Sequence, residues 1–467
     1  MLLACCFLRV ARNFRKDLFQ KIAQFDCKNR ALHRLTLRRK FCIIVSSCAE
    51  ARKKEFEMLT NKQMEKFAEL ALRIGANMQQ GQEVVVRCDV KCKDFAHLIA
   101  KKAYEFGAKR VLMQWGDEDL GRLAMLNETT ETLCDIPHYL VDQMDYFIER
   151  KCCLVSISAG NPAIFAGCDA NKLAAYQVAF SKARHKFLSA TMSNYLRWTI
   201  VSVPTDAWAN KVFPNDPTDV AVEKMWQAIG HIMRLDCDDP VAAWRKHIDT
   251  LHRRADFLNS HNFEYIHLKN GSGTDLKVGL ATDHQWIAAE EESQDGVPFT
   301  ANMPTEEIFT APHNKKIDGT VVNALPLVNN GNVIDKFSIT FKNGKVVDYS
   351  AEVGYDALKG ILTTDEGVLS LGEIALIGKK SPIAESGILF YNTLFDENAS
   401  CHLAFGASYP TTVKGGNDMT DEQLAQHGMN QSLQHVDFMI GTKDIDIDGI
   451  AHDGTVTPLF RDGEWVI

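Results

Sequence analysis

The chain has 467 residues, of which 46% are hydrophobic and 24% charged, the balance of a globular protein with room for two domains. Its net charge of −8 conceals a basic start, because residues 1–57 hold 14 Lys or Arg and only 5 Asp or Glu. The remainder is strongly acidic, which argues against nucleic-acid binding. The apolar runs near the start, such as residues 41–45, are far shorter than the ~20 residues that span a bilayer, so we predict no membrane segment.

The 13 cysteines are scattered, and no CxxC pair occurs with a matching His or Cys pair. This usage indicates reduced, buried thiols, and it argues against both a disulfide framework and a structural zinc site. We therefore expect a cytoplasmic protein.

Residues 1–57 differ from the rest of the chain in charge, cysteine content and patterning. They can be a mitochondrial transit peptide, a structured extension, or an over-extended start with synthesis beginning at Met58. A helical pattern opens directly after Met58, which favours the over-extended start. We predict that residues 1–57 are not part of the fold.

From Met58 onward, helical and strand-like patterns alternate, which predicts an α/β domain with a parallel sheet over residues 58–258. No GxGxxG follows the first strand and no GxxxxGK[ST] occurs, so a nucleotide-binding loop is disfavoured. A polar break at residues 259–262 marks the domain boundary. The expected helices cover about 61–78, 93–106, 169–188, 219–235 and 240–257, and the expected strands 83–88, 110–115, 152–160 and 197–205.

Residues 259–467 read as an α+β domain that is mostly antiparallel. Residues 263–280 read as two strands joined by a Gly-rich turn, and residues 336–351 as a hairpin with Asn343-Gly344 at its tip, a strong two-residue turn signal. The few helices expected are short, at 354–362 and 421–427.

Four segments of this second domain place carboxylates or imidazoles in apolar surroundings. A pair of adjacent acids or a single HxD is usually structural, but four such segments in one domain indicate a shared site. They are NMPTEEIFTAPH (302–313), LGEIALIG (371–378), NTLFDENASCHLAFGASYP (392–410) and QHVDFMIG (434–441).

The positions within these segments suggest their roles. Glu373 is the sole charge in its apolar segment, and an unpaired buried carboxylate would cost several kcal/mol, so it requires a partner. His435 and Asp437 are two residues apart, so on a strand they face the same side. Glu306 and Glu307 are neighbours that face opposite sides of an extended chain, so we expect them to have different functions.

Together the segments supply enough donors for a two-metal hydrolytic site, in which one carboxylate bridges the ions and the shared water becomes a nucleophile. Two imidazoles with four carboxylates suit Zn²⁺, Co²⁺ or Mn²⁺ better than Ca²⁺. Glu373 is our candidate for the bridge. The six predicted metal ligands are Glu307, Glu373, Glu397, His402, His435 and Asp437.

The segments NMPTEEIFT, GEIAL, NTLFDENASCHLAFGASYP and HVDFMIG resemble the signature segments of the thermophilic aminopeptidase family, which comprises metallopeptidases of the aminopeptidase T and aminopeptidase S type. The resemblance runs from about Met58 to Ile467. It implies two divalent metal ions, hydrolysis of N-terminal residues from peptides, and a homodimer. It also implies the same six metal ligands and an active-site tyrosine at Tyr409.

Two catalytic functions follow as hypotheses. Tyr409 would donate a hydrogen bond to the oxyanion of the tetrahedral intermediate, the alternative being an aromatic core residue before Pro410. Glu306 would be the general base on the metal-bound water. The donor set also leaves open another dinuclear hydrolase, such as an amidase or phosphodiesterase, and a non-catalytic protein that binds peptides or metals.

Overall fold

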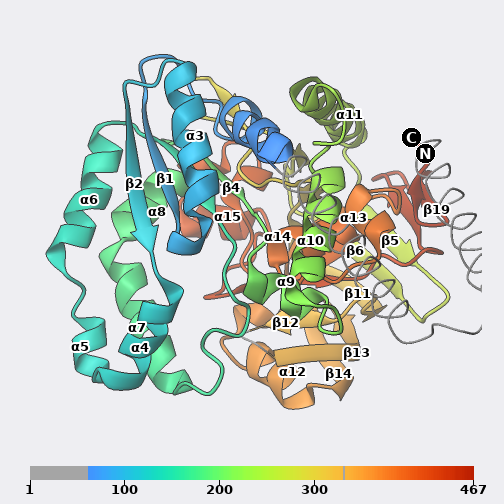
Figure 1. Cartoon of the computed structure of the whole chain (residues 1–467). Helices are drawn as coiled ribbons and strands as arrows, with labels where there is room; N and C mark the ends of the chain where they lie inside the picture. Colours follow the sequence, from blue (N-terminus) through green and yellow to red (C-terminus); the bar gives the residue numbers. More distant parts are fainter. Residues whose placement is uncertain (1–60, 330–331) are drawn as a thin grey trace, which may run out of the picture. The chain divides into compact units, whose positions relative to one another are not determined.

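The structure is a computed structural model that describes residues 61–329 and 332–467 (Figure 1). Residues Lys62–Ile467 form one compact unit, which contains the sheets of the described residues. The predicted extension, residues 1–57, lies outside the described residues. Among the described helices, none combines the length and the apolar character needed to cross a bilayer.

A parallel sheet with the strand order β2-β1-β3-β4 forms the first half of the described chain, as predicted. Its central strands β1 and β3 are largely buried, as expected where helices cover both faces. On one face, Val85 and Leu154 pack against Phe147 and Phe187. The strands are β1 (Glu83–Asp89), β2 (Arg110–Gly116), β3 (Cys153–Ile157) and β4 (Trp198–Val201).

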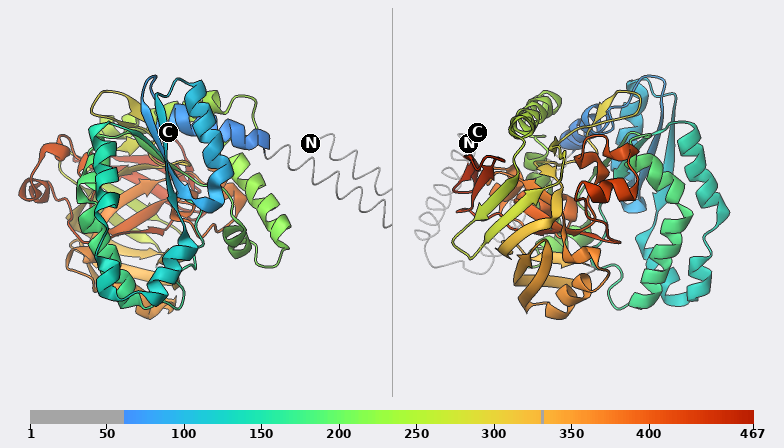
Figure 2. Two further views of the ribbon diagram at one scale, coloured as in Figure 1. Left: turned by 60° about the vertical axis from the view of Figure 1, so that its left-hand side comes forward. Right: turned by 180° about the vertical axis from the view of Figure 1, so that it is seen from behind.

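Helices flank this sheet, and they lie on the opposite side of the molecule from the antiparallel strands drawn in yellow to red (Figure 2). The helix expected over 169–188 is two helices, because the chain bends at Arg184. The helices within 118–149 were not predicted, since α4 exposes Leu120 and Leu123 and so shows no buried apolar stripe. The helices are α3 (Lys93–Glu105), α4 (Glu118–Asn127), α5 (Thr130–Cys134), α6 (His138–Glu149), α7 (Ala170–Ala183) and α8 (His185–Met192).

Residues 61–70 are helical and continue into a π-helical turn, η1 (Ala71–Gly75), so the first predicted helix is shorter than expected. After the parallel sheet come α9 (Asp206–Val212), α10 (Thr218–Ile232) and α11 (Pro240–His261). Because α11 runs to His261, the predicted boundary at residue 259 falls in its last turn. The division into 58–258 and 259–467 stays a prediction.

A large antiparallel sheet occupies the second half, with the order β12-β13-β11-β6-β5-β18-β19-β20 and β14 beside β13. The predicted hairpin is confirmed, because Lys342 pairs with Lys345 across a two-residue turn in which Asn343 and Gly344 have positive φ. The strands are β5 (Tyr265–Lys269), β6 (Asp275–Leu280), β11 (Pro312–Val322), β12 (Leu327–Asn329), β13 (Asn332–Lys342), β14 (Lys345–Val353), β18 (Asp446–Ile450), β19 (Val456–Arg461) and β20 (Glu464–Trp465).

A smaller antiparallel sheet, β17-β16-β15-β10-β7, packs against the large one. The ring of Phe438 in the small sheet lies 5.7 Å from that of Phe337 in the large sheet, within one shared apolar core. The predicted mostly antiparallel second half is therefore confirmed. The strands are β7 (Ile287–Ala288), β10 (Ile308–Thr310), β15 (Leu371–Leu376), β16 (His402–Gly406) and β17 (His435–Met439).

Short elements complete the described chain. The predicted helices near 354–362 and 421–427 are confirmed as α12 and α15. The short elements are η2 (Val90–Cys92), β8 (Glu291–Glu292), β9 (Pro298–Phe299), α12 (Tyr355–Leu362), η3 (Gly367–Leu369), α13 (Pro382–Ser386), α14 (Thr393–Asp396), η4 (Glu397–Ala399), η5 (Pro410–Thr412), η6 (Gly416–Asp418) and α15 (Asp421–Gln426).

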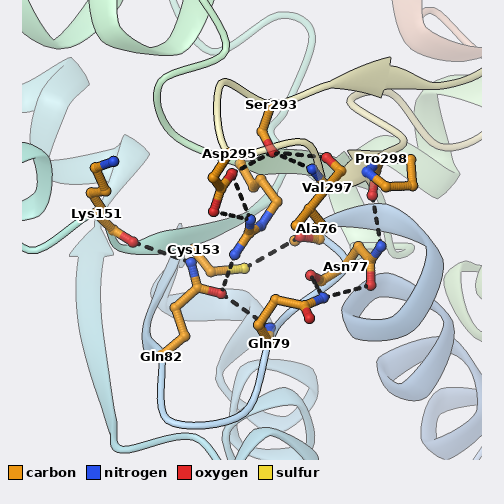
Figure 3. Close-up of polar contacts among 11 residues, drawn as sticks. Ala76, Asn77, Gln79, Gln82, Lys151, Cys153, Ser293, Asp295, Val297 and Pro298 are labelled. Atoms are coloured by element: carbon orange, nitrogen blue, oxygen red, sulfur yellow. Dashed lines mark hydrogen bonds and ion pairs between the residues drawn. The ribbon is translucent and has the colours of Figure 1, made fainter.

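The turn between β8 and β9 is tied to the parallel-sheet half by polar contacts (Figure 3). Arg197 is 4% exposed, and its guanidinium donates to both carboxylate oxygens of Asp295, at 2.9 and 3.0 Å, and to Gln82 at 2.9 Å. Close by, the side-chain amide of Asn77 donates to the carbonyl of Pro298 at 2.7 Å. Arg197 Nη1 donates to both oxygens of Asp295 while Nη2 donates to Gln82, and these charge-assisted bonds fix the turn against the sheet.

We predict that Arg197→Met lowers the free energy of unfolding by about 1–3 kcal/mol, because it removes a buried charged donor from two acceptors. Asp295→Asn should cost less, since that side chain is 51% exposed. Urea unfolding measures both. Lys336→Met, in an ion pair whose side chains are 64% and 69% exposed, is the control and should stay within about 0.5 kcal/mol. An equal loss of unfolding free energy in all three variants would show that the Arg197–Asp295 contact does not specifically hold the turn.

Candidate metal centre

The candidate site is built on the small antiparallel sheet. Glu373 of β15 and Asp437 of β17 both pair with Ala404 of the intervening strand β16, so these positions share one face of the sheet. His435 pairs with Gly406, two residues further along the same strand. Small residues on the middle strand therefore leave open space between the longer acidic and imidazole side chains.

The structure brings the predicted side chains together. His402 Nε2 lies 3.3 Å from Glu307 Oε2 and 3.3 Å from Glu373 Oε1. His435 Nε2 lies 3.5 Å from Glu373 Oε2 and 3.2 Å from Asp437 Oδ1. The donors thus form two groups, each with ligand atoms within 4.8 Å of one another, and Glu373 belongs to both.

Backbone carbonyls orient both imidazoles. His402 Nδ1 lies 3.2 Å from the carbonyl of Ser400, and His435 Nδ1 lies 2.7 Å from the carbonyl of Ala407. Since a carbonyl can only accept, each Nδ1 carries a proton and each Nε2 faces the carboxylates. Metal-ligating histidines are held in this way, with one nitrogen anchored by an acceptor and the other free for the ion.

The charges of the cluster are unbalanced without a cation. Burial lowers the pKa of His402 and His435, but hydrogen bonds to the carboxylates outweigh it, raising the pKa of His402 well above its usual value and that of His435 to about 11. Burial also raises the pKa of Glu373, yet hydrogen bonds from the two imidazoles lower it to about 2. The carboxylates therefore favour the protonated, positively charged form of both imidazoles.

Glu307, in the first donor group, and Glu397, which lies outside both groups, are carboxylates crowded by their charged neighbours. Burial raises the pKa of Glu307, and burial with the charges of Asp437 and Glu307 raises the pKa of Glu397 well above its usual value. The cluster holds four carboxylates and only two imidazoles, so it has an excess of negative charge that a bound cation would balance. This donor set fits divalent metal ions of the borderline type.

Tyr409 lies beside the donors. Its ring centroid is 4.7 Å from that of His435 and 6.3 Å from that of Phe309, so the ring is held from two sides. Burial and the charges of Glu373 and Asp437 raise the pKa of Tyr409 further above its usual value, so the phenol keeps its proton and stays a hydrogen-bond donor.

Glu306 does not join the cluster of predicted ligands, and its function as general base stays a prediction. Its carboxylate faces the opposite side of the chain from Glu307, where Arg234 Nη2 lies 2.9 Å and His247 Nε2 3.5 Å away. A base must reach the water whose proton it takes, and this carboxylate is instead neutralised by a guanidinium. Asp396 also lies apart, accepting hydrogen bonds from the backbone N–H groups of residues 390 and 392.

The donors and Tyr409 line a cleft of about 850 Å³. One wall comes from the parallel-sheet half, from residues 189–198, and includes Trp198; Phe309 and Ile287 add apolar surface from the small sheet. Among the described residues that line it, no Lys or Arg occurs. The wall residues could not be predicted, because they lie in segments whose patterns indicate only secondary structure. It also missed Arg234 and His247, which stand alone in helical surroundings.

A partly buried set of carboxylates and imidazoles that line a cleft between two sheet regions is typical of metal-dependent hydrolases. A family model described as thermophilic metalloprotease (M29) matches residues 60–465. The chain therefore belongs to the M29 family of thermophilic metalloproteases, and the resemblance seen in the four segments is confirmed.

Individual relatives agree with this. Aminopeptidase 2 of Geobacillus stearothermophilus is 43% identical over 404 residues, which cover 86% of this chain and 98% of that protein. Aminopeptidase AmpS of Bacillus subtilis is 41% identical over 405 residues, covering 87% and 98%. The solved structure of wild-type AmpT from Thermus thermophilus is similar with a TM-score of 0.82 and 38% identity, covering 87% of this chain and 100% of that one.

We predict that His435→Ala lowers the affinity for divalent metal by more than about 100-fold, because loss of an outer partner of a metal ligand already costs about 10–100-fold. Asp437→Asn should act in the same direction, since it keeps the shape of the side chain but loses its charge. Metal content after dialysis measures both. His452→Ala, at an exposed histidine, is the matched control. Unchanged metal content in His435→Ala would remove this residue from the site.

Proposed function

We propose that this chain is a metal-dependent aminopeptidase that uses two divalent metal ions to hydrolyse the N-terminal residue of peptides. The observation that carries the proposal is the pair of donor groups that share Glu373 at the base of the cleft. Membership of the M29 family and the relatives named as aminopeptidases support the activity.

Six residues would hold the ions. Glu307 and His402 would bind one ion and His435 and Asp437 the other, with Glu373 shared between them and Glu397 as a further donor. Mixed imidazole and carboxylate donors suit Zn²⁺, Co²⁺ or Mn²⁺. When bound, such ions lower the pKa of water and polarise the carbonyl of the scissile peptide bond.

The remaining residues of the cleft would bind and orient the peptide. The Tyr409 hydroxyl would donate a hydrogen bond to the developing oxyanion, with the ring held between His435 and Phe309. The apolar wall formed by Trp198, Ile287 and Phe309 would bind the first side chain and exclude water.

The charge of the cleft favours action from the amino end of the peptide. Several carboxylates line it, among them Glu290, Glu291 and Asp418, and its described lining residues include no Lys or Arg. A protonated α-amino group is attracted to such a surface, whereas a C-terminal carboxylate or a phosphodiester would meet no Lys or Arg among the described lining residues. This argues against the phosphodiesterase alternative.

A homodimer and a cytoplasmic location are also proposed, the first from the family resemblance and the second from the scattered cysteines.

The activity is tested with the purified full chain, supplied with Zn²⁺, Co²⁺ or Mn²⁺, and two versions of one peptide, with a free and with an acetylated N-terminus. We expect stepwise release of free amino acids from the first peptide alone, lost on chelation and restored by metal. Cleavage of both peptides would indicate an endopeptidase or amidase. Metal binding without release from any peptide in a mixed pool would indicate a binding protein.

We predict that Tyr409→Phe lowers kcat by about 10²–10³-fold, the cost of removing one oxyanion donor, because the hydroxyl acts in the transition state. The ring and its packing remain, so folding and metal content should survive, and KM should change little. Steady-state kinetics and metal analysis measure these quantities.

Tyr265→Phe, on β5 outside the cleft, is the matched control and should keep its kcat. A kcat near the wild-type value in Tyr409→Phe would make Tyr409 a packing residue. Joint loss of metal and rate would instead show that the phenol oxygen helps to hold an ion.

A further inference from the structure

Glu306 is a buried carboxylate for which the proposed metal centre has no use. It is 8% exposed and directly precedes Glu307, yet its side chain points away from the donors. Arg234 Nη2 donates to Glu306 Oε1 at 2.9 Å. Burying an ion pair costs free energy unless the two groups are well aligned, so the Arg234–Glu306 pair beside the predicted ligand Glu307 requires an explanation.

Arg234 is held in a backbone conformation that side chains rarely adopt. It follows α10 with φ = 60°, in the position where a helix usually ends on glycine. Its amide donates to the carbonyl of His231, and that of Leu235 to the carbonyl of Gly230, which closes the helix end. Glycine would fit this backbone without strain, so the residue is explained by its guanidinium and not by the turn.

The guanidinium is itself positioned. It lies over the ring of Trp244, 4.8 Å from the ring, and donates to the carbonyl of Ile232 at 3.1 Å. Trp244 is fully buried and donates to the carbonyl of Met233 at 2.9 Å. Arg234 therefore presents a fixed charge to Glu306, from helices that contribute no metal donor.

Side chains also hold the backbone on both sides of the Glu306 amide. His247 Nε2 lies 2.9 Å from the carbonyl of Thr305, which makes it the donor. Burial lowers the pKa of His247, so it is a neutral donor. The amide of Glu306 donates to Asn398 Oδ1 at 2.8 Å, and Asn398 Nδ2 lies 3.5 Å from Glu397 Oε1. Asn398 is fully buried and so links the segment of Glu307 to the carboxylate of Glu397.

From this geometry we infer that Glu306 is a positioning residue: with Arg234, His247 and Asn398 it fixes the segment from which Glu307 reaches the donor cluster. The inference rests on the proposed function, because only that function makes Glu307 a metal ligand that the fixed segment would orient. The alternation of an extended chain explains the arrangement, since anchoring Glu306 on one side directs Glu307 to the other. Outer contacts of this kind set the orientation of metal ligands and hence metal affinity.

The test compares Arg234→Gly and Glu306→Gln with the wild-type full chain, by calorimetric titration with Zn²⁺ and by kinetics at rising Zn²⁺ concentration. Arg234→Gly relieves the backbone and removes the guanidinium, whereas Glu306→Gln keeps the shape and removes the charge. We expect each to weaken Zn²⁺ binding about 10–100-fold, with kcat largely recovered at saturating metal. Arg234→Lys, which keeps the charge but not the fork, should fall in between.

Asn262→Gly is the matched control, because Asn262 is exposed and ends α11 with φ = 45° in the same left-handed region. It should leave Zn²⁺ affinity unchanged. Thermal unfolding of the chelated proteins separates positioning from general stability, since a purely structural role would lower the unfolding temperature without changing the affinity of the folded protein.

The outcomes are distinguishable. Loss of kcat at saturating Zn²⁺ with unchanged affinity in Glu306→Gln would overturn the positioning role and assign this carboxylate to the reaction itself. Wild-type affinity in both variants would also overturn it. A wild-type protein that binds no divalent ion would instead overturn the proposed function, and the inference with it.

Discussion

The constraint on which the site depends is electrostatic. Glu307, Glu373, Glu397 and Asp437 lie with two imidazoles in one partly buried group, and carboxylates so placed repel one another unless a cation lies among them. Glu373 has the central position because its two oxygens face different histidines. The small sheet and the contacts around it hold these carboxylates together despite their mutual repulsion.

The small sheet provides the first part of that support. Its strands set Glu373 and Asp437 on one face at the same level, and Ala404 and Gly406 between them leave room for the charged groups. Packing against the large sheet, through rings such as Phe438 and Phe337, makes this face rigid. Carbonyl groups then turn the imidazoles, so the donors are oriented before any ligand arrives.

The sequence predicted much of this, for identifiable reasons. Continuous apolar runs and an Asn-Gly turn mark the parallel strands and the hairpin, because burial and turn geometry leave local signals. The spacing of His435 and Asp437 placed them on one face of a strand, where they lie. The alternation of Glu306 and Glu307 was also foreseen, and the two carboxylates do face different partners.

What the sequence could not predict depends on contacts between distant segments. Nothing near Glu306 indicates that Arg234 lies against it, since the two meet only when the residues that follow α10 fold against the segment before β10. The amphipathic signal of α4 was absent because Leu120 and Leu123 face outward. The wall of the cleft could not be predicted either, because Trp198 belongs to a strand of the parallel sheet and is far from the donors in the sequence.

That division of the cleft has an evolutionary consequence. The donors come from the antiparallel half, whereas part of the wall comes from residues 189–198, next to β4 of the parallel sheet. Substitutions in this wall can change which side chains fit without moving a carboxylate or an imidazole. Residues 189–198 can thus differ in size and polarity independently of the donor segments, whereas Ile287 and Phe309 share the small sheet with the donors.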